Sequence, residues 1–159
     1  MKKHIIIISV FLSLGIYAQG QVNSHALGLR GGGDGDIIGG EISYQRGLND
    51  VNRIEYDLGW GGSATHNRIT LVGIYHWDMN INGGLNWYIG PGGALGLYSY
   101  DNEPGYFNIA LGGQVGLEYD FNSVDVPFLL SIDARPMWDF LGDNSGLGWG
   151  AALGLRYTW

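Results

Sequence analysis

Hydrophobic and polar residues alternate with a period of two along most of the chain after residue 20. From 107 to 119 the odd positions hold Phe, Ile, Leu, Gly, Val, Leu and Tyr, and the even positions between them hold Asn, Ala, Gly, Gln, Gly and Glu. Such alternation is typical of β-strands with two different faces, and turn-forming Gly, Asp and Asn separate the alternating segments. The pattern predicts eight strands, at 24–31, 37–47, 52–61, 67–78, 83–98, 106–119, 127–138 and 147–159.

Two strands depart from the simple pattern. In 67–78, Val72 and Ile74 fall on the otherwise polar face. In 83–98, Pro91 stands between glycines, and because proline lacks a backbone N–H we expect a bulge or kink there.

The make-up of the two faces indicates which one points inward. One face carries large apolar and aromatic side chains, and the other carries mostly Gly, Ala, Ser and Asn with scattered charges. Small residues suit the narrow interior of an eight-stranded barrel, and an apolar outer face suits lipid. The chain has 29 glycines, and 14% of its residues are charged, against roughly 25% in a typical soluble domain. The pattern therefore favours a membrane barrel over a secreted soluble barrel of the lipocalin-like kind.

The first 18 residues have the features of a secretory signal peptide. Lys2 and Lys3 precede an apolar stretch at 5–16, and Ala18 is a small residue suited to cleavage before Gln19. Twelve apolar residues are too few for a spanning helix, which needs about 20. We therefore expect a leader at 1–18 and a single barrel domain at 19–159.

Loss of the leader leaves an acidic chain with arginine as its only strongly basic residue. Both lysines lie in the leader, so the formal net charge falls from −7 to −9. A chain without a basic patch is not expected to bind nucleic acid. The chain has no cysteine, which excludes disulfides and lipid attachment through a cysteine.

The polar face carries equal numbers of acidic and basic residues. Buried charges are costly unless they are paired, and the planar arginine side chain can hold two carboxylates. We therefore predict a structural network of charges in the interior, which pairs Arg156 with a carboxylate such as Asp133. The predicted members are Arg30, Glu41, Arg53, Glu55, Asp57, Arg68, Glu118, Asp133, Arg135 and Arg156.

An export signal, eight alternating strands and a terminal aromatic residue together resemble the small outer-membrane β-barrel proteins of the OmpA/OmpX type. The stretches 39–48, 52–60 and 83–96 resemble the outer-membrane β-barrel domain proteins of Bacteroidetes-type bacteria. The resemblance covers the mature chain and implies an all-β, eight-stranded antiparallel up-and-down transmembrane β-barrel in the bacterial outer membrane. Trp159, with Tyr157 two residues before it, matches the C-terminal signal that the barrel assembly machinery reads in this class.

The resemblance implies location more than activity, because one fold hosts many functions. We expect a non-enzymatic protein with a structural or surface role and no cofactor or metal. Its implied partners are outer-membrane lipid and lipopolysaccharide, together with the assembly machinery and periplasmic chaperones during biogenesis. A monomer is favoured. The N-terminus is expected in the periplasm, with the connections near 32–36, 61–66, 99–105 and 139–146 outside.

Two other functions stay open. A narrow porin-like channel would use the interior charges as an ion path, although side chains nearly fill an eight-stranded barrel. An enzyme that modifies lipid A would need a histidine with a hydroxyl and an acid, and of His25, His66 and His76 only His66 lies in an outer connection, near Ser63. Acidic residues in the connections, such as Asp34 and Asp101, match no calcium-loop spacing and suit turns.

Overall fold

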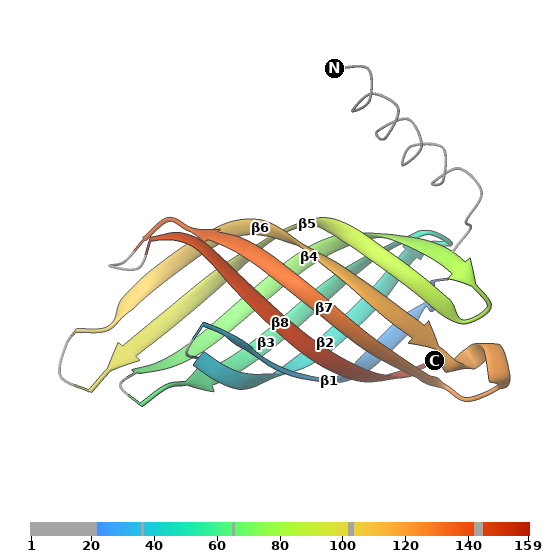
Figure 1. Ribbon diagram of the computed structural model, residues 1–159, viewed down its shortest axis with the longest axis horizontal. Coiled ribbons are helices and arrows are strands. Elements are labelled where there is room, and N and C mark those ends of the chain that lie inside the picture. Colours follow the sequence, from blue (N-terminus) through green and yellow to red (C-terminus); the bar gives the residue numbers. More distant parts are fainter. Residues whose placement is uncertain (1–21, 36, 65, 102–103, 142–144) are drawn as a thin grey trace, which may run out of the picture.

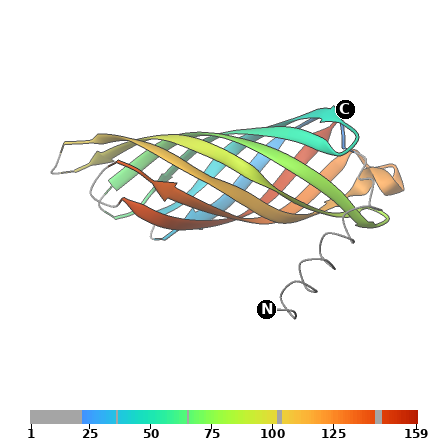
Figure 2. The ribbon, with the colours of Figure 1, turned by 90° about the horizontal axis from the view of Figure 1, so that it is seen from above.

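The chain forms a closed barrel of eight antiparallel strands, each paired with its neighbours in sequence, with β1 also paired with β8 (Figures 1 and 2). The computed structural model describes residues 22–159 except 36, 65, 102–103 and 142–144. The strands are β1 (His25–Asp34), β2 (Ile37–Asn49), β3 (Asn52–Gly62), β4 (His66–Asn82), β5 (Leu85–Tyr100), β6 (Tyr106–Asp120), β7 (Phe128–Asp139) and β8 (Gly146–Thr158). The eight predicted strands and the antiparallel up-and-down barrel are confirmed.

The barrel has two ends that differ in their connections. The end near residue 22 and Trp159, called the terminal end below, carries the turns at 50–51 and 83–84 and a short 3-10 helix, η1 (Phe121–Val124). The other end, called the distal end, carries the remaining four connections. The predicted leader at 1–18 and its cleavage site lie outside the described residues. In the described part of the chain, no helix is long and apolar enough to cross a membrane.

Pro91 interrupts one ladder of β5 without changing its register. Pairing with β4 stops opposite Gly90 and Pro91 and continues in the same register on both sides, from Ile74–Gly92 to Trp77–Ile89. Pairing with β6 runs through the proline. The expected bulge at this position is therefore wrong. The register shifts instead next to two turns of the terminal end, at Gly47/Asn49 in β2 and Asn80/Asn82 in β4.

Gly90 explains why β4 and β5 can run so close together at that point. A Cβ built on Gly90 would lie 1.7 Å from the backbone oxygen of Tyr75, so only glycine fits. Gly150 on β8 differs, because the nearest heavy atom to its Cβ position is 3.6 Å away.

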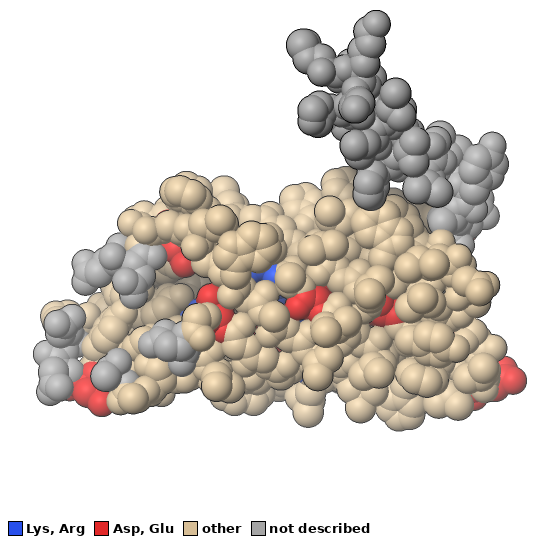
Figure 3. All heavy atoms as spheres, in the orientation of Figure 1, with Lys and Arg blue, Asp and Glu red and all other residues tan. Residues whose placement is uncertain are grey.

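The barrel is polar inside and apolar outside. Eighteen polar or charged residues are buried among the described residues, against seven hydrophobic ones, while most large hydrophobic side chains of the outer face are exposed, for example Leu29 at 62% and Ile69 at 57%. The view in Figure 3 shows mostly uncharged atoms over one side of the molecule. Val72 and Ile74, the two exceptions in β4, are buried in the interior. A soluble barrel would have the opposite distribution.

Candidate functional site: the polar interior

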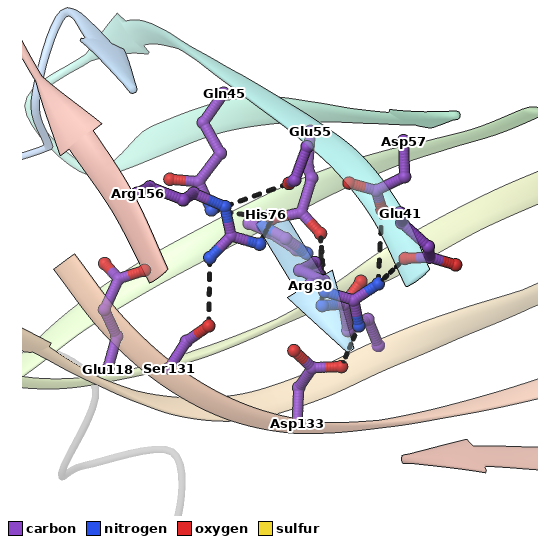
Figure 4. A network of polar contacts seen from close by, with 12 residues as sticks. Arg30, Glu41, Gln45, Glu55, Asp57, His76, Glu118, Ser131, Asp133 and Arg156 are labelled. Carbon is purple, nitrogen blue, oxygen red and sulfur yellow. Dashed lines mark hydrogen bonds and ion pairs between the residues drawn. The ribbon is translucent and has the colours of Figure 1, made fainter. Parts of the chain in front are cut away.

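The ten predicted charged residues come from seven strands. Eight of them are buried, with at most 9% of the residue exposed, and the side chains of Arg68 and Glu41 are 18% and 22% exposed. They separate into a central cluster, a group near the terminal end and a group near the distal end. The central cluster comprises Arg30, Glu41, Glu55, Asp57, Asp133, Arg135 and Arg156 (Figure 4).

Glu55 on β3 lies at the middle of the central cluster. Its Oε2 is 2.9 Å from Nη2 of Arg156, and its Oε1 is 3.3 Å from Nη2 of Arg135 and 3.9 Å from Nε of Arg30. The amide of Gln45 donates a further hydrogen bond to Oε2 at 2.6 Å. Three strands besides β3 therefore direct an arginine at one fully buried carboxylate.

Two of the remaining acids, Asp57 and Glu41, join Arg30 to Arg135, and the third, Asp133, binds Arg30. Asp57 pairs with Arg135 and lies 3.6 Å from Nη1 of Arg30. Glu41 pairs with Arg30, and its Oε1 is 3.2 Å from Nη1 of Arg135. Asp133 accepts hydrogen bonds from Arg30 and, at 3.2 Å, from the hydroxyl of Tyr88. The two arginines thus each bind several carboxylates, as the planar guanidinium allows.

Arg156 points into the interior and pairs with a carboxylate, as predicted, but the candidate partner Asp133 is wrong. Arg156 lies opposite Leu129 on β7, four residues before Asp133, which is a separation of about 13 Å along the strand. Asp133 instead binds Arg30 from β1. Arg156 reaches Glu55 across the interior and donates to the hydroxyls of Ser43 and Ser131, each at 2.9 Å.

Arg53 organises a second group toward the terminal end. Its Nη1 is 2.7 Å from Glu118 and 3.1 Å from Asp78, and its guanidinium lies 4.7 Å from the ring centre of Tyr88. His76 is fully buried beside it. Asp78 was not among the predicted interior residues, although the alternation puts it on the same face of β4 as Arg68 and His76.

The distal half of the interior contains a cavity of about 110 Å³. Half of its lining residues are glycine or alanine, from β1, β2, β3, β5, β6 and β8, and Figure 3 shows the molecule hollowed toward this end. The inner end of the cavity is closed by Arg30, Glu41 and Arg135 of the central cluster. The small residues of the inner face thus leave open space in this half of the described barrel.

Two polar pairs line the wider part of the cavity. Arg68 on β4 binds Asp34 on β1 at 2.8 Å and lies 3.5 Å from the hydroxyl of Tyr98. Asn108 on β6 donates to Asp139 on β7. Asp34 and Asp139 are further interior acids, so the expectation that Asp34 lies in a connection is wrong. β1 continues to Asp34 and β7 to Asp139, and at strand ends the two faces are hard to tell apart from the sequence. With Asp78 they bring the interior to eight acids and five arginines.

The three histidines occupy different places. His66 begins β4 at the distal end, where its Nδ1 lies 2.9 Å from the hydroxyl of Ser63 and its ring contacts Tyr100. His76 is in the interior, and His25 is on the outer face at the terminal end. Among the residues with described positions, no group of three His, Cys, Asp or Glu side chains is arranged to hold a metal ion.

Structural comparison places the fold among small bacterial outer-membrane barrels. The N-terminal β-barrel domain of Pseudomonas aeruginosa OprF gives a TM-score of 0.66 at 22% identity, covering 89% of this chain and all of that one. Neisserial surface protein A gives 0.64 at 17% identity, covering 85% and 94%. Ail, the attachment invasion locus protein of Yersinia pestis, gives 0.56 at 11% identity, covering 87% and 100%.

These likenesses show the fold, an eight-stranded barrel of the outer-membrane kind. No family model and no curated protein matches the sequence. The narrower resemblance to Bacteroidetes-type proteins receives no support from the comparisons.

Proposed function

We propose that the chain is an integral protein of the bacterial outer membrane, which it crosses with its eight strands. The observation that carries this proposal is the inverted distribution of side chains: Ile38 and Leu153 are 75% and 61% exposed on the outer face, whereas Glu55 and Arg156 are fully buried. In water that outer face would be an aggregation-prone surface, whereas in a membrane its apolar side chains contact the apolar acyl chains of the lipid. Closure of the β1–β8 seam satisfies the backbone groups that lipid cannot.

Its role is structural or at the cell surface, without catalysis or conduction. Support for this comes from the central cluster, because ion pairs from β1, β2, β3, β7 and β8 fill the cross-section below the distal cavity. Hydrophobic side chains add to the filling, with Val72, Ile74 and Leu129 all buried in the interior. A porin-like channel would need this packing to open, and a lipid A-modifying enzyme would need more than the Ser63–His66 pair.

The proposal extends to orientation and partners. The terminal end lies in the periplasm and the distal end outside, with outer-membrane lipid and lipopolysaccharide around the barrel and a monomer as the working state. During biogenesis, periplasmic chaperones and the assembly machinery handle the chain, and Tyr157 and Trp159 form the signal that the machinery reads. Both residues are exposed on the outer face, with ring centres 6.2 Å apart. Membership of the Bacteroidetes-type barrel family is part of the proposal.

Cell fractionation tests this function directly. The full-length chain, expressed in a Gram-negative host, is expected in the outer-membrane fraction, with a gel mobility that changes on heating. A soluble periplasmic product would contradict the proposal.

Two further assays separate the alternative roles. The purified protein is expected to produce no ion conductance in planar bilayers, and its expression is expected to leave the mass of lipid A unchanged. Steady conductance that disappears when Arg135 and Asp133 are both neutralised would establish the channel instead. A changed lipid A mass that reverts in His66→Ala would establish the enzyme.

A further inference from the structure

Arg46 is the one arginine after the leader that does not enter the interior. It lies on the outer face of β2 near the terminal end and is exposed. The other five arginines point inward and pair with carboxylates. Arg46 takes part in none of the ion pairs formed within the described part of the chain. An exposed arginine on an otherwise apolar face can bind an anion from outside the chain.

His25 on β1 lies directly opposite Arg46 in the strand pairing, on the same outer face. Directly opposed side chains on one face of a sheet have Cβ atoms about 5 Å apart, so the imidazole and the guanidinium are neighbours. The Nδ1 of His25 is 2.8 Å from the hydroxyl of Tyr44. That hydrogen bond occupies Nδ1 and leaves Nε2 as the nitrogen that can meet a ligand.

Trp159 completes the group from the other side of the seam. Its ring stacks on His25 at 5.5 Å between centres, and its backbone N–H donates to the backbone oxygen of His25 at 3.1 Å. Tyr157 and Phe128 continue the same aromatic band onto β8 and β7. Aromatic bands of this kind lie at the level of lipid head groups. The donors of Arg46, His25 and Trp159 therefore lie where lipid phosphates are found.

The surface on the distal side of this group is apolar and fits acyl chains. Leu29 on β1 lies opposite Ile42 on β2, and both are exposed on the outer face. Leu27 lies between His25 and Leu29 on the same face and is also exposed. The cationic group thus stands at one end of an apolar strip on two neighbouring strands. A glycerophospholipid has the matching form, with a phosphodiester at one end and apolar chains below it.

We infer that Arg46, His25 and Trp159 form a binding site for the phosphodiester of a glycerophospholipid in the periplasmic leaflet. The inference rests on the proposed membrane placement and adds a specific lipid contact to it. Charge supports a lipid over an acidic protein partner that arrives from the water, because the turns of this end carry the exposed acids Asp50 and Asp125. These acids repel anions that approach from the water, whereas Arg46 faces the lipid side.

Native mass spectrometry of the full chain in mixed micelles tests the site. The probes are phosphatidylglycerol and diacylglycerol with the same acyl chains. The wild-type barrel is expected to retain phosphatidylglycerol and to release diacylglycerol. Arg46→Gln is expected to weaken retention of phosphatidylglycerol about fivefold, which is the effect of one arginine at an anionic lipid surface. Arg46→Lys keeps the charge and is expected to keep most of the retention.

Ile38→Gln is the matched control, because it puts the same glutamine on the outer face of β2 near the distal end. It is expected to retain phosphatidylglycerol as the wild type does. Equal retention by wild type and Arg46→Gln, or equal retention of the two lipids, would overturn the inference. Displacement by millimolar inorganic phosphate would also overturn it, because the site would then take a free anion. A wild-type chain that does not insert into vesicles would instead overturn the proposed function.

Discussion

Replacing Glu55 by glutamine removes the negative charge that three interior arginines share. The change keeps the size of the side chain and leaves the backbone untouched. Arg156 is affected most, because Glu55 is its only ion-pair partner among the described residues. It would keep hydrogen bonds to two serine hydroxyls but would be a buried cation without a counter-charge.

The geometry gives the size of the effect. Unit charges 2.9 Å apart, the distance from Arg156 to Glu55, attract by about 6 kcal/mol at an effective dielectric constant of about 20. The variant no longer has to desolvate a carboxylate, which offsets part of this loss. Removing one partner from a buried ion pair costs about 3–5 kcal/mol in the free energy of unfolding, and we expect Glu55→Gln to fall in that range.

Urea unfolding in lipid vesicles, followed by tryptophan fluorescence and gel mobility, measures the difference. Asp50→Asn in an exposed turn is the control and is expected to change the free energy by less than about 0.5 kcal/mol. The double variant Glu55→Gln/Arg156→Met removes both charges and is expected to recover at least about 1.5 kcal/mol relative to additivity. A Glu55→Gln barrel as stable as the wild type would refute the assignment of Glu55 as the centre of the network.

Two other predictions concern the backbone and the C-terminus. Gly90→Ala puts a Cβ 1.7 Å from the backbone oxygen of Tyr75 and is expected to lower the free energy of unfolding by more than about 3 kcal/mol. Gly150→Ala has room for its Cβ and is expected to change the free energy of unfolding by less than about 0.5 kcal/mol. Equal stability of the two variants in urea titrations would show that β4 and β5 do not approach so closely. Trp159→Ala is expected to lower the amount of barrel in the outer membrane severalfold while the purified variant still refolds in detergent; unchanged levels in cells would remove Trp159 from the assembly signal.

The strands and their two faces were predictable because a barrel wall imposes a strict period of two on the sequence. Each strand has an apolar outer face on one side and a narrow polar interior on the other, so the type of residue at almost every position indicates its face. Val72 and Ile74 broke the period because they are apolar side chains buried in an otherwise polar interior. Pro91 did not produce a bulge because only the pairing with β4 is interrupted there, while the pairing of β5 with β6 runs unbroken from Leu85 to Tyr98.

The alternation predicted which charged residues lie inside the barrel. It did not predict which of them form ion pairs with one another. Pairing depends on the stagger between strands and on reach across the interior, and neither is visible in the pattern. Arg156 therefore seemed close to Asp133 on the neighbouring strand, yet it binds Glu55 from β3 across the barrel. The interior acids at strand ends, such as Asp34, were hidden because loops and strand ends share the same residue types. The outward position of Arg46 was implied by its even number on β2, beside Ile42 and Tyr44.

The most direct test of the proposed membrane placement measures whether the outer face of the barrel contacts lipid or water. The chain has no cysteine, so Leu153→Cys on the outer face and Asp50→Cys in a turn each introduce one unique site for an environment-sensitive fluorophore. In vesicles, the label at 153 is expected to emit at shorter wavelength and to be quenched by spin-labelled lipid, and the label at 50 to be quenched by aqueous iodide. Quenching of the label at 153 by iodide, with no effect of the lipid quencher, would contradict a barrel whose outer face is in the membrane.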